Sequence, residues 1–269
     1  MSLCSAHSSK PTLPETVIQR YLQRIKSPYE RLPSLRYLRL LHRNHMMHVP
    51  FENLDIHLGN EIILDAKRVL QKVIIKKRGG FCYELNGIFC LLLKAIGFDA
   101  QLISARVYSE GNYGREMDHA AILVHLDHKS YLCDVGFGDS FLSPKVMHVG
   151  EVQMDYNLYY RIDKNAEGDY ILSRSEDSIT FTELYLFTKK ERQWIEFIDM
   201  CHFHQHNPSS HFTQKKVITI AKPDGRLTLS DEKMTRVQLG QKIETPILNH
   251  DEFQVLLHQH FGILYRKSR

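Results

Sequence analysis

Apolar residues recur at helical spacing in the first hundred residues, which predicts a mainly helical region over residues 1–97. Asp65 can cap one of these helices, and Gly97 follows another in the position that commonly ends a helix. Residues 1–13 are expected to form a loose arm. The four expected helices begin near Pro14, Leu35, Asp65 and Cys82.

From residue 98 to residue 188 the pattern changes to short runs rich in β-branched and aromatic residues, which turn residues separate. We expect Asp127-His128 to form a two-residue turn that pairs residue 126 with 129 and, in the same register, 121 with 134. These residues therefore predict an antiparallel β block. The expected strands are Gln101–Tyr108, His119–Leu126, Tyr131–Phe137, Leu158–Ile162, Tyr170–Ser173 and Phe181–Phe187.

The third region, residues 189–269, has a mixed pattern. A long helix is expected from Lys189 to about His204, and a hairpin is expected over Phe212–Ile220 and Arg226–Leu229. Asn249 and Glu252 have the spacing of a capping box for a last helix that ends before Gly262. Helices, then an antiparallel block, then a smaller mixed region indicate the α+β fold class.

Composition and charge narrow the function. The chain has 269 residues, 43% of them hydrophobic and 25% charged, as in ordinary globular proteins. The net charge is only +4, and the basic residues are scattered, so we expect no nucleic-acid partner, whereas a small anionic ligand fits. The N-terminus has no apolar signal region, and no apolar run approaches the roughly 18 residues of a membrane span. We therefore expect a cytoplasmic protein with no membrane partner.

The cysteines leave one open question. Their odd number and the lack of a CxxC pair argue against a disulfide scaffold and a thiolate zinc site. Cys82 begins a helix, where the helix dipole favours the nucleophilic thiolate. On position alone, a buried structural cysteine is the favoured interpretation. Cys4 lies in the arm, and the other three are expected to be core or half-buried: Cys90, Cys133 and Cys201.

A nucleophilic thiol needs a base and a group that orients the base. His119 begins one expected strand and Asp134 lies on the next, and the predicted turn places them diagonally on one face of the sheet. Apolar neighbours would shield this pair from water, which strengthens the interaction between carboxylate and imidazole. The residues therefore favour Cys82, His119 and Asp134 as a candidate triad.

Several ordered motifs resemble those of the arylamine N-acetyltransferases, of the prokaryotic type. The resemblance extends from about residue 18 to the last helix. The motifs are Val49-Pro-Phe-Glu-Asn-Leu54, Arg78-Gly-Gly-Phe-Cys-Tyr-Glu-Leu-Asn86, Asp118-His119, Tyr131-Leu-Cys-Asp-Val-Gly-Phe-Gly138, Pro208-Ser-Ser-His-Phe212 and Pro223-Asp-Gly-Arg-Leu227.

The resemblance implies a papain-like arrangement of a helical bundle, an antiparallel β-barrel and an α/β lid. It implies a catalytic triad on Cys82, His119 and Asp134. Cys82 would take an acetyl group from acetyl-CoA as a thioester and pass it to an arylamine, an arylhydrazine or an N-hydroxyarylamine, with ping-pong kinetics. No metal is implied, and the protein is expected to be a monomer or a homodimer.

The resemblance also implies the substrate contacts. Phe51, Phe137 and Phe212 match acceptor-pocket positions, for which core packing is the alternative interpretation. Gly111, Gly114 and Arg115 match a loop that meets CoA in relatives, although a solvated turn fits the same pattern. The resemblance also implies that Glu52 and Arg78 brace the bundle beside the site.

One stretch departs from the family pattern, and three alternative functions remain open. Relatives carry a Ser-Thr-His type of run before Pro208, whereas this chain has Cys201-His-Phe-His-Gln-His-Asn207, which puts the acceptor range and CoA contacts in doubt. Its alternating histidines would scatter around a helix end and do not predict a metal site. The alternatives are another acyl-CoA donor, an amide synthase, and a transglutaminase-like enzyme or thiol hydrolase.

Overall fold

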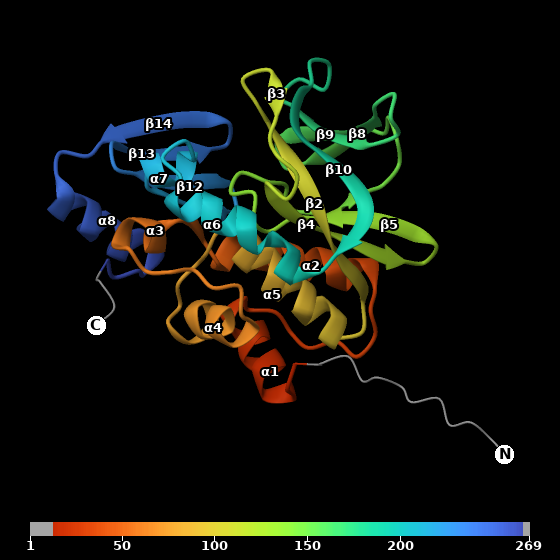
Figure 1. The fold of residues 1–269 in the computed structure, drawn as a ribbon, viewed down its shortest axis with the longest axis horizontal. Coiled ribbons are helices and arrows are strands. Elements are labelled where there is room, and N and C mark those ends of the chain that lie inside the picture. The colour runs from red at the N-terminus through yellow and green to blue at the C-terminus, as the bar shows by residue number, and fades with distance from the viewer. Residues whose placement is uncertain (1–12, 266–269) are drawn as a thin grey trace.

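The computed structural model describes residues 13–265, and Figure 1 shows a group of helices beneath two separate sheets. Helix α5 lies between the other helices and the larger sheet, and every side chain from Cys82 to Cys90 is buried. A helix that is apolar on all sides needs such a position. The helical region contains α1 (Glu15–Arg24), α2 (Leu35–His48), α3 (Leu54–Leu58), α4 (Ala66–Leu70), a π-helical turn (Gln71–Ile75) and α5 (Cys82–Ala95).

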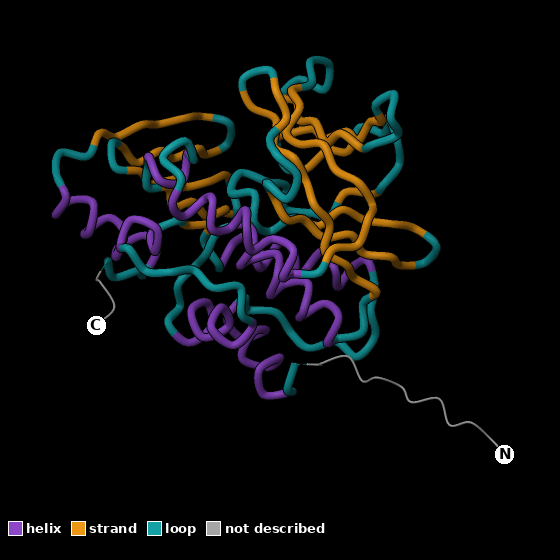
Figure 2. Tube along the Cα trace, viewed as in Figure 1, coloured by secondary structure: helices purple, strands orange, loops and turns teal. Residues whose placement is uncertain are grey.

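The larger sheet is antiparallel and curves around a core of its own (Figure 2). The strand order is β6-β5-β4-β2-β10-β9-β8-β7, and β3 pairs with β2. Inward-facing residues such as Ile103, Leu132 and Phe187 fill a cluster separate from the helical core. The strands are β2 (Asp99–Ser109), β3 (Asn112–Tyr113), β4 (His119–Leu126), β5 (Lys129–Cys133), β6 (Lys145–Val146), β7 (Gln153–Asp155), β8 (Leu158–Lys164), β9 (Tyr170–Ser175) and β10 (Thr182–Arg192).

The hairpin of β4 and β5 has the predicted register. Leu126 pairs with Lys129, and Ile122 pairs with Cys133. Asp127 and His128 both have positive φ angles, 49° and 60°, as a two-residue type I′ turn requires. The ladder continues to Cys133, so Asp134 lies one residue beyond the end of β5 rather than on the strand. The predicted strand over Tyr131–Phe137 is therefore too long at its C-terminal end.

The smaller sheet has the strand order β1-β11-β12-β13-β14. Its first strand, β1, lies between α2 and α3 in the chain, and it joins this sheet through the pairing of Phe51 with Thr219 of β11. This pairing fixes the smaller sheet to the helices beside the start of α5. Helix α8 begins with the predicted cap, in which the Asn249 side chain accepts a hydrogen bond from the Glu252 amide. The elements are β1 (Phe51–Glu52), β11 (Val217–Lys222), β12 (Gly225–Ser230), β13 (Lys233–Gln238), β14 (Gln241–Pro246) and α8 (His250–Phe261).

Two further predictions about residues 189–220 are wrong. The expected helix from Lys189 begins as strand, because β10 continues to Arg192, and a 3₁₀ turn (Trp194–Phe197) then leads into α6 (Ile198–His206). Phe212 lies in the short helix α7 (His211–Gln214), and β11 begins only at Val217. The division of the chain at residues 97 and 188 stays a prediction, and the arm at residues 1–13 lies outside the described residues except for Leu13.

Candidate active site

The thiol of Cys82 lies at the first residue of α5, as predicted. Phe81 precedes the helix, and its backbone amide donates to Glu84 Oε2 at 3.1 Å, which satisfies one free amide of the first turn. The loop after β5 passes directly over this turn. A Cβ on Gly136 would lie 2.8 Å from Cys82 Cα, so only glycine permits this approach.

Burial opposes the predicted effect of the helix start on the Cys82 thiol. Burial raises the pKa of the Cys82 thiol well above its usual value, and a hydrogen bond with the backbone of Ala120 offsets only part of the effect. Cys82 is 2% exposed, so the loss of solvation outweighs the favourable helix dipole. Burial therefore disfavours an isolated thiolate at Cys82, and forming the thiolate requires a partner that takes its proton.

A His–Asp pair lies at the end of the adjoining hairpin. His119, the first residue of β4, places Nε2 at 2.8 Å from Asp134 Oδ2. His119 is 3% exposed and Asp134 is fully buried. Burial by itself would raise the pKa of Asp134, but the charge of His119 and three hydrogen bonds outweigh it, so the pKa lies below its usual value. Asp134 is therefore ionised at neutral pH.

The surrounding chain holds the Asp134 carboxylate in one orientation. Its Oδ1 atom accepts hydrogen bonds from Asn86 Nδ2 at 2.9 Å and from the Gly136 amide at 3.0 Å. The Asp134 amide donates to His42 Nε2 at 3.0 Å, so α2 also fixes this loop. Oδ1 is thus occupied by these donors, and Oδ2 is left for His119.

This geometry determines the tautomer of His119. A carboxylate oxygen only accepts hydrogen bonds, so His119 Nε2 carries the hydrogen in the bond to Asp134. In the neutral imidazole the other nitrogen, Nδ1, is then the basic one. A base held by a carboxylate in a water-poor site, with a thiol in the same cavity, has the parts of a nucleophilic triad.

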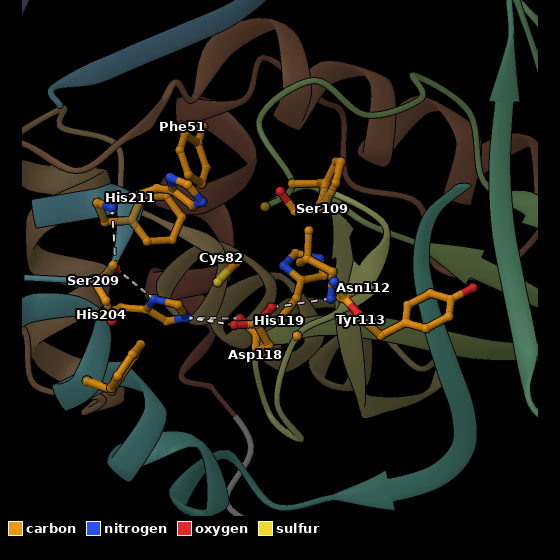
Figure 3. A pocket seen from close by; sticks show the side chains of 17 residues that line it. Phe51, Cys82, Ser109, Asn112, Tyr113, Asp118, His119, His204, Ser209 and His211 are labelled. Atoms are coloured by element: carbon orange, nitrogen blue, oxygen red, sulfur yellow. Dashed lines mark hydrogen bonds and ion pairs between the residues drawn. The ribbon is translucent and has the colours of Figure 1, made fainter. Parts of the chain in front are cut away.

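Cys82 and His119 line the same cavity, which has a volume of about 440 Å³. In the view of Figure 3, the Cys82 sulfur points into the cavity between His119 and His204. The three predicted acceptor contacts also line it: Phe51, Phe137 and Phe212. A second cavity of about 900 Å³ between the two sheets shares these three residues, so the two spaces adjoin at the aromatic side chains.

The loop predicted to contact CoA is only partly at this cavity. Gly114 lines it, and a Cβ there would lie 2.2 Å from Asp118 Oδ2. Gly111 lies in a turn with a φ of 84°, and the Arg115 guanidinium lies 4.6 Å from the centre of the Phe203 ring. The role of these three residues in CoA binding stays a prediction.

A buried cluster of charges lies beneath the start of α5. The predicted brace is present, since Arg78 Nη2 lies 2.8 Å from Glu52 Oε1. Lys72 lies 2.7 Å from Asp55 and 2.9 Å from Glu84, the residue that caps α5. The carboxylates raise the pKa of Lys72 despite its burial, so this cation remains charged. Lys72 therefore links the π-helical turn to the helix that carries the thiol.

The other described cysteines are buried and free. Burial raises the pKa of both Cys90 and Cys201 to about 12, and it also raises the pKa of Cys133. High thiol pKa values therefore do not distinguish Cys82, which is singled out because it shares a cavity with the His–Asp pair. Cys4 lies outside the described residues.

Sequence reasoning missed two residues that hold the loop of Asp134 in the candidate triad. Asn86 lies one helical turn after Cys82, and its polarity within an apolar helix could have identified it. Its Nδ2 donates to Asp134, and its Oδ1 accepts from the Val135 amide at 2.9 Å. His42 gave no such signal, because a histidine in an amphipathic helix is common.

Among residues 13–265, no group of three or more His, Cys, Asp or Glu side chains is arranged to hold a metal ion. Within the same range, no helix has the length and apolarity that a membrane crossing demands.

The chain as a whole is similar to known proteins. A family model described as N-acetyltransferase matches residues 34–268. A Salmonella typhimurium protein named arylamine N-acetyltransferase / N-hydroxyarylamine O-acetyltransferase is 30% identical over 250 residues, which cover 91% of this chain and 88% of that protein.

Solved structures show the same similarity. The arylamine N-acetyltransferase structure from Salmonella typhimurium matches with a TM-score of 0.87 and 28% identity, over 92% of this chain and 91% of that one. The Mycobacterium marinum arylamine N-acetyltransferase in complex with CoA matches with a TM-score of 0.85 and 26% identity, over 91% and 92% of the two chains.

Proposed function

Because this chain belongs to the arylamine N-acetyltransferase family, we propose that Cys82, His119 and Asp134 are its catalytic triad. The protein is an acyltransferase that moves an acetyl group from acetyl-CoA to the nitrogen of arylamines or arylhydrazines, or to the oxygen of N-hydroxyarylamines. The observation that carries the assignment of residues is the 2.8 Å pair of His119 and Asp134 at the cavity that Cys82 lines.

In the first half-reaction, His119 Nδ1 takes the proton of the Cys82 thiol, and the thiolate attacks the acetyl carbonyl of acetyl-CoA. The bond from the carbonyl carbon to the CoA sulfur breaks, and the CoA sulfur leaves with the proton from His119. Cys82 then holds the acetyl group as a thioester. Because burial disfavours a free thiolate, the imidazolium and thiolate form together, stabilised by the Asp134 charge.

In the second half-reaction, the acceptor nitrogen attacks the thioester carbon. The acceptor loses a proton to His119 as the carbon–nitrogen bond forms, and the bond to the Cys82 sulfur breaks. The sulfur recovers the proton from His119, which restores the resting enzyme. Two steps that share one acetyl-enzyme give ping-pong kinetics.

The aromatic wall of the cavity supports a planar acceptor. Phe51 and Phe212 have ring centres 6.1 Å apart, and Phe137 lies 5.3 Å from His119. We assign these three residues to the arylamine ring. Gly111, Gly114 and Arg115 are assigned to the CoA side, since Gly114 lines the same cavity. We further place the enzyme in the cytoplasm, as a monomer or a homodimer.

Intact-protein mass spectrometry after treatment with acetyl-CoA tests the assignment. We expect one acetyl group on the native protein, none on Cys82→Ala, and one on the matched control Cys90→Ala. An adduct on another cysteine, or no adduct, would refute the mechanism.

Release of CoA with and without an aromatic amine tests the reaction class. Transfer requires the amine for continued turnover, whereas a thiol hydrolase releases CoA at the same rate without it. A panel of acyl-CoA donors then measures whether acetyl is the preferred group, and an equal preference for longer acyl groups would contradict the assigned donor.

A further inference from the structure

A second His–Asp pair lies on the wall of the acceptor cavity. His204, in the stretch that departs from the family pattern, is 8% exposed. Its Nε2 atom lies 3.2 Å from Asp118 Oδ1 and 3.3 Å from the Asp118 carbonyl oxygen. Its Nδ1 atom lies 3.0 Å from Ser210 Oγ. The neighbouring His202 and His206 are exposed and stack on each other.

The contacts of His204 show that it is a link and not a free base. Both Asp118 oxygens only accept, so Nε2 carries a hydrogen and donates it. Ser210 Oγ accepts from the Phe212 amide at 3.3 Å, which leaves its hydroxyl hydrogen for Nδ1. Both ring nitrogens thus have partners, and no lone pair of His204 is left for the substrate.

The two partners of His204 belong to different walls of the cavity. Ser210 caps α7, and the ring of Phe212 in that helix lies 5.2 Å from the His204 ring. Asp118 directly precedes His119, and its Oδ2 atom accepts from the Val107 amide at 3.2 Å. His204 therefore joins the segment that carries Phe212 to the strand that begins with the proposed base.

We propose that His204 is a specificity-determining positioning residue, which holds the Phe212 wall close to His119 and thereby limits the width of the aromatic acceptor that reaches the acetylated Cys82. This inference rests on the proposed function. Without His204, α7 keeps its contacts to Asn53 on the far side, where Phe212 O and Lys215 O accept from Asn53 Nδ2. The Phe212 ring is then free to move away from His119, while the backbone of α7 stays attached to Asn53.

A competition assay between two acceptors tests this proposal. A one-ring arylamine and a fused-ring arylamine are mixed with acetyl-CoA, and the ratio of their products gives the ratio of their kcat/KM values. Both acceptors react with the same acetyl-enzyme, so a general loss of triad function cancels from the ratio. The product ratio therefore distinguishes a change in the width of the acceptor cavity from structural damage that slows both reactions equally.

For His204→Leu, which removes both hydrogen bonds, we expect the ratio of fused-ring to one-ring product to rise at least about fivefold. His204→Gln retains a donor and an acceptor and should keep the ratio near that of the native protein. His202→Leu makes the same change at an exposed position and serves as the matched control. Ser210→Ala removes the hydrogen bond to His204 together with the cap on the Phe212 amide, but it leaves the contact of His204 with Asp118. We expect it to give a smaller shift in the same direction, even where His204→Leu fails to fold.

An unchanged ratio in both His204→Leu and Ser210→Ala would overturn the proposal, as would an equal shift in His202→Leu. Either result, obtained with normal acetylation of Cys82, would leave the proposed function intact. Failure of acetyl-CoA to label Cys82 in the native protein would instead refute the proposed function itself.

Discussion

Replacing Asp134 with Asn is the sharpest test of the triad, because the structure determines how the new amide must lie. Asn86 Nδ2 and the Gly136 amide both donate to Oδ1. The amide oxygen of the variant must therefore occupy that position, since an NH₂ group there would face two donors. The NH₂ group then takes the place of Oδ2, opposite His119 Nε2.

This orientation reverses the tautomer of His119. Nε2 must accept from the new NH₂ group, so the hydrogen of the neutral imidazole moves to Nδ1, and the base for Cys82 is lost. The stabilising charge is lost as well. A pair of charges near 4 Å is worth about 4 kcal/mol at an effective dielectric constant of about 20, which corresponds to a factor of about 10³ in rate. The same change in a Ser-His-Asp triad lowers kcat by about 10⁴.

We therefore expect Asp134→Asn to slow the acetylation of Cys82 by a factor of about 10³ to 10⁴. Single-turnover release of CoA, measured with enzyme in excess over acetyl-CoA, reports this step alone. Asp251→Asn changes an exposed carboxylate on α8 in the same way and should leave the rate unchanged. A rate for Asp134→Asn within tenfold of the native rate, in a protein with a normal melting temperature, would refute the assigned tautomer.

The charge cluster beneath α5 gives two further predictions. Lys72→Met leaves three buried carboxylates without this cation, so it should lower the free energy of unfolding by about 3–5 kcal/mol in urea denaturation. The exposed control Lys67→Met should change the free energy of unfolding little, and equal effects of the two variants would contradict the role of Lys72. Burial raises the pKa of Asp55, but the cations Lys72 and Arg78 outweigh this effect and lower the pKa to about 2. The ionised Asp55 side chain therefore contributes its full stabilisation above the ordinary pKa of 3.8, and this stabilisation is lost as the pH falls toward 2. Urea denaturation at pH 7, 4 and 3 should show less loss of stability in Asp55→Asn than in the native protein, and parallel losses would refute the assignment.

Much of the fold was predictable because it depends on local chemistry. The β4–β5 hairpin illustrates this, since a two-residue turn at Asp127 and His128 fixes which residues face each other along both strands. That register brought His119 and Asp134 to the same end of the hairpin. The expected helix from Lys189 failed for the opposite reason. Glu191 and Arg192 suit a helix, but they pair with Ile103 and Leu102 of β2, and this contact between distant residues outweighs local preference.

The sequence by itself determined the change from helices to antiparallel strands, the position of Cys82 at a helix start, and the hairpin register that brings His119 and Asp134 together. Only the tertiary structure decided the pKa direction of the Cys82 thiol, because the solvation that burial removes depends on what packs over the helix. It also decided the orientation of Asp134, through Asn86 and Gly136, and the link that His204 makes across the acceptor cavity. These properties arise from atoms that are far apart in the chain, so no local pattern of residues could specify them.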